Sequence, residues 1–324
     1  MRSFFRPASA PEWLGEVLNS IRGALSDEWP TPLKLAQYAA NSAPPPSDWT
    51  GGEIYVPDEI SGAVPAFSDG TSWRRVTDRA VIYSNPASLF FDGTAEGAYY
   101  DPTDISTLWK DTAGTVPVTA HGDAVARVDD LSGNGFHLIQ ATAANRPLYD
   151  VAGSVRSLLF DGTNDFFNIT NCSTMLTGWT AASGAFAATM TDDTPAVSAG
   201  GVFGYFAASD GVDYYPTTAG DVRSSFCTSV RKVNADPGNM QAWHNTTIRS
   251  TANDFRYELN GTSVLSTAVN TFQVATGNPN YPTIGDNGTP EYFKGNLGRL
   301  VFINRILTDA EMANVRTSLA AGYA

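Results

Sequence analysis

The sequence predicts a mainly β protein whose largest part is an antiparallel β-sandwich or jelly roll. Only 16% of the 324 residues are charged, and 29 Gly and 19 Pro supply many turns. Short apolar runs alternate with polar turn residues from about residue 89 to residue 304. Asn260-Gly261, which separates two such runs, is the strongest hairpin signal. Many short strands joined by tight turns predict two packed antiparallel sheets.

Charge and hydropathy exclude several classes of protein. The chain has 20 Lys and Arg against 33 Asp and Glu, a net charge of −13, and such a surface repels phosphate backbones. We therefore expect no nucleic acid partner. No apolar run is long enough to span a membrane, so we expect no membrane insertion. Cys172 and Cys227 are expected to be two buried thiols rather than a disulfide, because no export signal is visible.

An amphipathic helix is expected over residues 1–28. Ser9 and Glu12 form a capping-box pattern, and Pro11 stands in the first turn, where its missing N–H costs nothing. A helix this short is marginal alone, so it must pack on its own chain or on a partner. Both alternatives stay open. The apolar stripe that would dock it contains Trp13, Leu14, Val17, Leu18, Ile21 and Leu25.

Two further segments precede the predicted sandwich. Residues 29–52 contain five prolines and end in Gly51-Gly52, which predicts an extended linker. Residues 53–85 switch to a period of two and predict a small β module with strands at 54–56, 63–67 and 73–82. About 30 residues bury little core alone, so this module is expected to need a neighbouring domain or subunit.

The predicted sandwich occupies residues 86–324. Expected strands include 89–91, 157–160, 166–169, 186–190, 201–206, 223–227, 239–244, 249–259, 281–284 and 297–304. A helix should close the domain, because Thr308 and Glu311 repeat the capping-box pattern. Met312, Val315 and Leu319 would face the core.

Both ends of this region resemble a known family. Residues 97–150, followed by LLFDGTNDFF at 158–167, resemble the opening of laminin-G-like, concanavalin A-like domains of phages and virus-like particles. Residues 281–312, which contain IGDNG, GNLGRL and NRILTDAE, are similar to the close of such domains. The resemblance implies a concanavalin A-like jelly roll from about residue 89 to the end.

A second resemblance concerns the small β module. Residues 51–82 resemble a module that precedes such domains in head- or tail-fibre proteins of phages and gene transfer agents. It implies a virion spike or fibre, assembled in the host cytoplasm, with its N-terminal part on other virion proteins and its sandwich outward. A module that cannot close its own core, behind an apolar helix, favours oligomers, and we expect a homotrimer.

Motifs for catalysis are scarce, so the sequence is expected not to be an enzyme. Some relatives on this fold carry Glu-x-Asp-x-Glu on one strand, and that string is absent. Asp129-Asp130 are adjacent and would face opposite sides of a strand, so we expect them in a turn. His121, His137 and His244 show no metal-binding spacing. Two alternatives remain open: a capsule-degrading glycoside hydrolase and a purely structural decoration protein.

Calcium is the one cofactor the sequence leaves possible. Hard oxygen ligands gather in DDLSGNG and DGTND, although Asp and Asn are also ordinary turn residues. The candidate ligands are Asp129, Asp130, Asn134, Asp161 and Asp165.

Carbohydrate binding is the leading hypothesis. Aromatic rings stack on the C–H faces of sugars, and neighbouring Asp or Asn side chains bind the hydroxyls. Aromatics fall among such polar residues in three segments, although each group also fits an ordinary sandwich edge. The candidates are Asp210, Asp213, Tyr214 and Tyr215, then Trp243 and Asn245, then Tyr281, Asp286 and Asn287. The sequence thus predicts a protein that binds cell-surface polysaccharide.

Overall fold

The computed structural model describes most of the chain from residue 86 onward and parts of the region before it. The described residues are 35–38, 46–56, 64–68, 73–76, 86–90, 94–196, 198–207, 215–234, 238–276, 282–286 and 291–323. The expected docking helix and its stripe from Trp13 to Leu25 lie outside these ranges. Within them, no helix is both long enough and apolar enough to cross a membrane.

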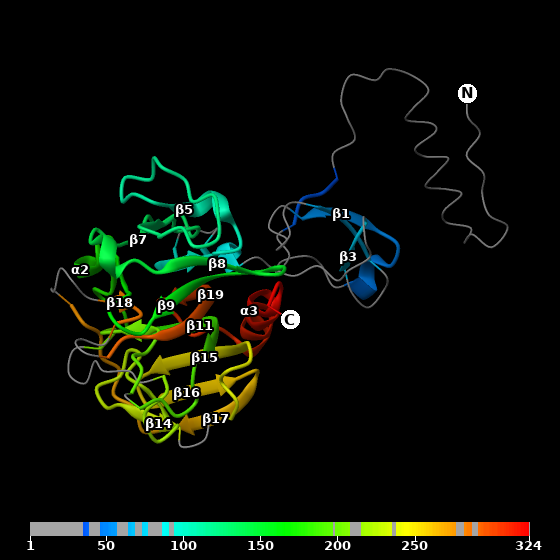
Figure 1. Ribbon diagram of the computed structural model, residues 1–324. Coiled ribbons are helices and arrows are strands. Elements are labelled where there is room, and N and C mark those ends of the chain that lie inside the picture. Colours follow the sequence, from blue (N-terminus) through cyan, green and yellow to red (C-terminus); the bar gives the residue numbers. More distant parts are fainter. Residues whose placement is uncertain are drawn as a thin grey trace, which may run out of the picture.

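The predicted antiparallel β-sandwich is confirmed (Figure 1). The larger sheet runs in the order β17 (Thr262–Thr267), β16 (Asp254–Leu259), β15 (His244–Thr251), β11 (Ala181–Met190), β19 (Lys294–Ile303), β9 (Val155–Asp161) and β8 (Leu148–Ala152), with β4 (Gly97–Tyr100) also paired to β19. The second sheet runs in the order β12 (Phe203–Gly204), β18 (Thr283–Ile284), β10 (Phe167–Ile169), β7 (Leu138–Ile139), β6 (Arg127–Val128) and β5 (Leu108–Trp109). A separate pair joins β13 (Val222–Ser224) to β14 (Lys232–Asn234).

An aromatic core fills the space between the two sheets. Gly184 on β11 lets this core approach the sheet, because a Cβ there would lie 2.9 Å from the rings of both Phe203 and Phe226. Strand β11 is central and buried on both faces, so its side chains are mostly small. The phenylalanines buried in this core include Phe160, Phe167, Phe186, Phe203, Phe206, Phe226, Phe293 and Phe302.

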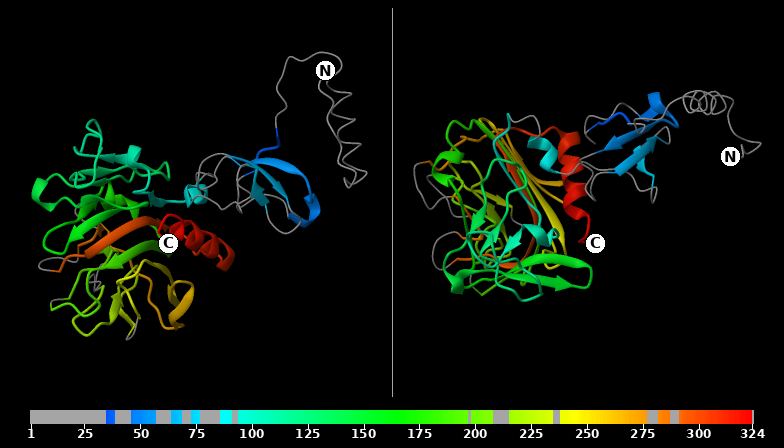
Figure 2. Two further views of the ribbon diagram at one scale, coloured as in Figure 1. Left: turned by 45° about the vertical axis from the view of Figure 1, so that its right-hand side comes forward. Right: turned by 90° about the horizontal axis from the view of Figure 1, so that it is seen from above.

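The closing helix α3 (Asp309–Ala320) covers the outer face of the larger sheet, away from the second sheet (Figure 2). Its capping box is confirmed: the Thr308 hydroxyl accepts from the Glu311 amide, and the Glu311 carboxylate accepts from the Thr308 amide. Met312, Val315 and Leu319 are buried as expected. They pack on outward side chains of the sheet such as Ala185 and Val301.

A buried arginine holds the end of α3 on the sheet. The guanidinium of Arg299 donates from Nε to Asp101 Oδ2 at 2.8 Å, and from Nη1 to the carbonyl oxygens of Ser318 and Ala321. These carbonyls belong to the last turn, where a cation is favourable. Tyr99 donates to the same Asp101 oxygen at 3.1 Å. The ion pair therefore joins β4, β19 and α3.

Several expected strands differ from the observed ones. The predicted strand 249–259 is interrupted, because Asn253 adopts φ +63° and turns the chain between β15 and β16. Predicted strand 89–91 falls at a 3-10 helix, Pro86–Phe90. The hairpin at Asn260-Gly261 is confirmed between β16 and β17, with φ +49° and +78°. Other short helices in the described part of the sandwich are Ile105–Thr107, Ala143–Asn145 and α2 (Cys172–Met175).

The small β module forms an antiparallel sheet of β1 (Glu53–Val56), β2 (Val64–Ser68) and β3 (Trp73–Arg75). Its own apolar cluster contains Ile54, Val56, Ala66 and Trp73. Parts of the expected linker pack on it: the ring of Trp49, from the 3-10 helix Pro46–Trp49, lies 6.4 Å from that of Trp73. These parts of the expected linker thus belong to the module.

The cysteines match the expectation. Cys172 and Cys227 are both buried and are not joined in a disulfide.

Candidate functional site

The candidate site is a hollow on the outer face of the larger sheet, where β15 begins and α3 ends. Its volume is about 240 Å³. The residues that line it are Ala187, Trp243, His244, Asn245, Asn260, Ala320 and Tyr323. Of the sequence-predicted site residues, the structure places Trp243 and Asn245 here together.

An aromatic pair forms one wall of the hollow. The rings of Trp243 and Tyr323 lie 4.4 Å apart at an angle of 32°. Tyr323 is buried, and the Arg299 guanidinium lies 5.9 Å from its ring centroid. Trp243 is only half-buried. The buried tyrosine and the arginine thus hold a partly exposed indole in place.

Two asparagines from neighbouring strand ends are locked together at the hollow. The Asn260 amide donates to the Asn245 carbonyl at 2.8 Å, and the Asn245 amide donates to Asn260 Oδ1 at 2.8 Å. Asn245 Nδ2 makes a long bond of 3.4 Å to the Arg316 carbonyl. Among the described residues, Asn245 Oδ1 and Asn260 Nδ2 have no partner, and neither has Trp243 Nε1. These groups remain able to accept from and donate to a ligand.

His244 is a buried side chain whose two ring nitrogens both have hydrogen-bond partners in the protein. Its Nδ1 lies 2.9 Å from the Ala242 carbonyl, which can only accept, so Nδ1 carries the proton. Nε2 therefore accepts from the Tyr215 hydroxyl, at 2.5 Å. Burial lowers the pKa of His244. The imidazole is thus neutral and fixed in one tautomer.

Charged groups beside the hollow are already paired. Arg316, whose side chain passes Gly261, donates to Glu258 at 2.8 Å. Glu258 also binds Arg249, which in turn pairs with Asp309. This chain of ion pairs fixes α3 to β15 and β16.

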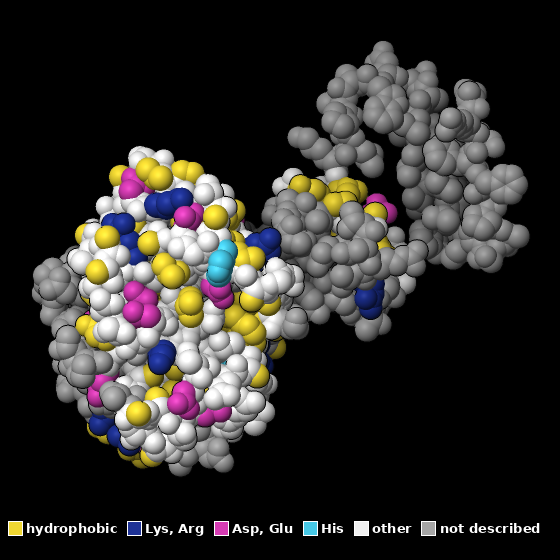
Figure 3. Space-filling view, in the orientation of Figure 1, with side chains coloured by type: hydrophobic (Ala, Val, Ile, Leu, Met, Phe, Trp, Pro, Cys, Tyr) yellow, Lys and Arg dark blue, Asp and Glu magenta, His cyan; other side chains and the backbone are white. Residues whose placement is uncertain are grey.

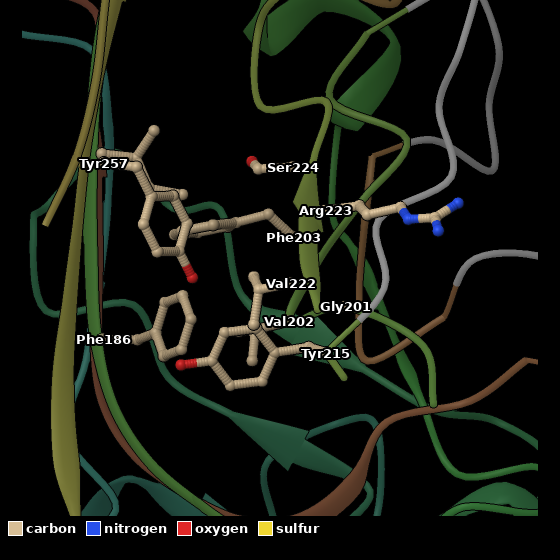
Figure 4. Close-up of a pocket in the computed structure, with 10 residues that line it drawn as sticks. Phe186, Gly201, Val202, Phe203, Tyr215, Val222, Arg223, Ser224 and Tyr257 are labelled. Atoms are coloured by element: carbon tan, nitrogen blue, oxygen red, sulfur yellow. The ribbon is translucent and has the colours of Figure 1, made fainter. Parts of the chain in front are cut away.

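The other described sugar candidates, Tyr215 and Asp286, do not line this hollow. Tyr215 is 3% exposed and lies in the core, so its ring offers no surface platform. Together with Phe186, Phe203 and Tyr257 it borders a cavity of about 10 Å³ (Figure 4). That volume suits one water molecule and is far too small for a sugar. Asp286 forms a β-bridge with Tyr292. Asp210, Asp213, Tyr214, Tyr281 and Asn287 lie outside the described residues.

The DDLSGNG candidates for calcium organise a turn after β6, as the adjacent aspartates predicted. The carboxylate of Asp130 accepts from the amides of Tyr99, Ser132 and Phe136 and from the Ser132 hydroxyl. Asp129 accepts from Arg127 at 2.6 Å and from Trp109 at 2.7 Å. These oxygens are already occupied by protein donors.

Asn134 fixes this loop to the segment before β4. Its side-chain amide donates to the carbonyl oxygens of Ala95 and Gly97 at 3.2 and 3.0 Å. In the part of the chain that the structure describes, no group of three or more His, Cys, Asp or Glu side chains is arranged to hold a metal ion.

Asp161 and Asp165 form a tight loop after β9. Asp165 is 5% exposed and accepts from the Asp161 amide at 2.9 Å. Asp161 accepts from the amides of Thr163 and Asn164. Burial raises the pKa of Asp165 to about 6, and the Asp161 charge adds to that rise. The loop therefore contains two carboxyl groups, and that of Asp165 holds its proton more strongly than usual.

Sequence reasoning missed two residues of the hollow. Asn260 was interpreted only as a turn residue, yet the pairing of Thr246 with Leu259 in the β15–β16 register places it beside Asn245. Recognising the turn at Asn253 would have revealed this neighbour. Tyr323 follows α3, and no local pattern links it to Trp243.

Comparison with known proteins gives matches only at the level of structure. No protein family matches the sequence. No curated protein matches it either.

Three solved structures illustrate the likeness. One is a Trypanosoma rangeli sialidase (TM-score 0.43, 10% identity), where 69% of this chain matches 32% of that one. Another is domain 4 of AbnA, a GH43 extracellular arabinanase from Geobacillus stearothermophilus, in complex with arabinotriose. Its TM-score is 0.42 and its identity 16%, and 68% of this chain matches 98% of that one. The third is the CBM40 of a Ruminococcus gnavus IT-sialidase, with a TM-score of 0.39 and 14% identity, where 49% of this chain matches 96% of that one. The chain spans about a third of the sialidase, and identities this low show the fold alone.

One sequence-based prediction is corrected by this comparison. The chain was expected not to be an enzyme because the Glu-x-Asp-x-Glu string is absent. The structures to which it is similar include a sialidase. The missing string therefore does not exclude catalysis.

Proposed function

We propose that this chain is a particle-attached spike or fibre protein whose sandwich binds cell-surface carbohydrate in the hollow beside Trp243. The observation that carries the proposal is a partly exposed indole flanked by two immobilised amides with unused hydrogen-bonding atoms. Carbohydrate sites combine these elements: a ring face for sugar C–H groups and amides for hydroxyls.

The hollow is preorganised for such a ligand. Trp243 packs on Tyr323. The asparagine pair is held by one backbone–backbone bond and by one bond from the Asn245 amide to the Asn260 side chain, so binding orders few side chains. Preorganisation lowers the entropic cost of association. Carbohydrate-binding neighbours such as the AbnA domain share the sandwich type, which fits the proposal without locating its site.

A binding assay with the full chain tests the site. Trp243→Ala should weaken binding to host-cell polysaccharide, or to its best glycan-array ligand, by at least tenfold, because the stacking surface is lost. Trp109→Ala is the matched control: it removes another half-buried tryptophan, from β5 of the second sheet. Equal loss in both variants, or none in Trp243→Ala, would refute the assignment. Circular dichroism of each variant verifies that it is folded.

Attachment to a particle is supported by the resemblance of residues 51–82 and by the expected apolar stripe of residues 1–28. Deleting residues 1–50 should abolish association with the particle while the released protein still binds glycan. Light scattering of the full chain should give a trimer. A stable monomer that still assembles on particles would remove the trimer from the proposal.

A second candidate function is hydrolysis of the bound polysaccharide. One observation favours it: Asp165, with its raised pKa, stands in one loop with Asp161, whose amide donates to it, and glycoside hydrolases use two carboxyl groups. Incubation with host capsule should then release reducing ends, and Asp165→Asn should abolish this release without weakening binding. No release by the wild-type chain from any capsule that it binds would dismiss this candidate.

A further inference from the structure

We infer that the hollow beside Trp243 takes a single uncharged sugar ring, such as a neutral hexose or an N-acetylhexosamine at the end of a glycan. This inference rests on the proposed carbohydrate binding and adds the class of ligand. It follows from the charge, the hydrogen-bonding atoms and the size of the site.

The residues that line the hollow carry no charge. Six of the seven have uncharged side chains, and the seventh, His244, is held neutral between the Ala242 carbonyl and the Tyr215 hydroxyl. Burial lowers its pKa, which keeps it neutral near pH 7. A sugar carboxylate would thus meet no cation on the wall of the site.

The nearest arginines are not available either. Arg316 donates to Glu258, and Arg299 donates to Asp101 and to the last carbonyls of α3. Drawing either guanidinium toward a ligand would leave a carboxylate behind with less compensation, which is costly at buried positions. Asp101 and Glu258 are both largely buried.

In the described part of the chain, the end of α3 offers an anion no cation and no free donor on the wall of the hollow. Ala320, the last residue of the helix, lines the hollow, and its carbonyl accepts from the Tyr323 amide. The carbonyls of Ser318 and Ala321 accept from Arg299, so this guanidinium is used within the protein. On the face of the molecule that Figure 3 shows, uncharged side chains and backbone separate scattered charges.

The unused atoms match hydroxyl or acetamido groups. Within the described residues, Asn245 Oδ1 can accept a hydrogen bond, whereas Asn260 Nδ2 and Trp243 Nε1 can donate. A sugar hydroxyl both donates and accepts, so it can satisfy this mixed set, which a carboxylate cannot. The volume of about 240 Å³ lies below the usual range of pockets for drug-sized ligands. It therefore suits one ring rather than a chain.

Calorimetry or saturation-transfer NMR on the full chain can test this class directly. The probes are methyl glycosides of neutral hexoses and N-acetylhexosamines, set against glucuronic acid and sialic acid. We expect at least one neutral glycoside to bind at least tenfold tighter than either acid, with an affinity that is unchanged between low and high salt. Asn245→Ala should abolish that binding.

A charge variant at the rim provides the matched control. Ala320→Lys places a cation on an exposed lining position, and Ala320→Gln adds comparable length without charge. Only the lysine should raise the affinity for acidic sugars, and it should do so in a salt-dependent way. If the wild-type hollow prefers an acidic sugar, and Asn245→Ala removes that binding, the inference is wrong while the proposed function stands. If no sugar of either class depends on Trp243 or Asn245, both are wrong.

Discussion

The DDLSGNG loop at residues 129–135 and the hollow beside Trp243 both gather polar side chains, but they use them in opposite ways. In the loop, the Asp130 carboxylate accepts four hydrogen bonds from three residues around it. In the hollow, the Asn245–Asn260 pair uses its backbone and one side-chain oxygen internally and leaves other amide atoms unused.

The difference shows how a polar cluster becomes available to a ligand. A short Asp side chain in a turn is consumed by the backbone amides that the turn exposes. In the hollow, one backbone amide is satisfied by a backbone carbonyl and the other takes only one side-chain oxygen, so Asn245 Oδ1 and Asn260 Nδ2 remain unused among the described residues. Residue type alone does not separate the two cases, because the hydrogen-bond partners of each side chain determine whether its polar atoms are available to a ligand.

The largest expected effect is on stability and concerns the loop. Asp130→Ala removes an acceptor that serves four donors at a buried position, and should lower the free energy of unfolding by about 3 kcal/mol or more. Urea unfolding measures this loss. Asp111→Ala is the matched control: its carboxylate also accepts from two amides and a hydroxyl, but it lies in an exposed turn and should cost much less. Equal costs would show that burial does not distinguish the loop.

The second effect concerns the ionisation of Asp165, in the separate loop that follows β9. Burial raises the pKa of Asp165 from 3.8 to about 6, so the folded chain binds this proton more tightly than the unfolded chain. Its contribution to stability is therefore greatest below pH 4 and falls as the pH rises through 6. Asp165→Asn, which is always neutral, should be more stable than wild type at pH 7.5, by at most about 3 kcal/mol. The advantage should shrink toward pH 4.5, and a pH-independent difference in urea unfolding would contradict the shift.

The sequence alone predicted the structural features that depend on interactions within a few residues. The Thr308–Glu311 capping box and the Asn260-Gly261 turn each act within a few residues, and both are present. The turn at Asn253 was missed because apolar alternation continues on both sides of it, so the two strands were read as one.

The hollow could be predicted only in part, because it joins three distant segments. Trp243 with Asn245, the turn residue Asn260, and Tyr323 beyond α3 meet only after β15, β16 and the helix have packed. Tyr215 was predicted to be a surface residue of a sugar site because its sequence neighbours are polar, and this prediction is wrong. Its ring packs on Phe186 in the core, and its hydroxyl is hydrogen-bonded to His244.

Two substitutions of Asn260 separate its role in the turn conformation from its role as a hydrogen-bond donor to a ligand, and their expected effect on stability is smaller. Asn260 adopts φ +49°, so Asn260→Ala should cost about 1 kcal/mol of stability and also lose binding. Asn260→Asp tolerates the same backbone conformation and keeps the oxygen that binds the Asn245 amide, but replaces the NH₂ donor. It should fold as well as wild type and bind glycan at least tenfold more weakly. Full binding by the Asp variant would show that Nδ2 does not contact the ligand.

The smallest expected effect is that of calcium on stability. Asp129 and Asp130 already accept from Arg127, Trp109 and the amides of their own loop, and a calcium ion would have to replace these donors. Thermal unfolding in millimolar Ca²⁺ and in EDTA should therefore give the same midpoint. An ion that binds only the folded state would raise the midpoint with concentration. A calcium-dependent rise that Asp130→Asn abolishes would show that the loop exchanges its internal partners for a metal, and the contrast between loop and hollow would then fail.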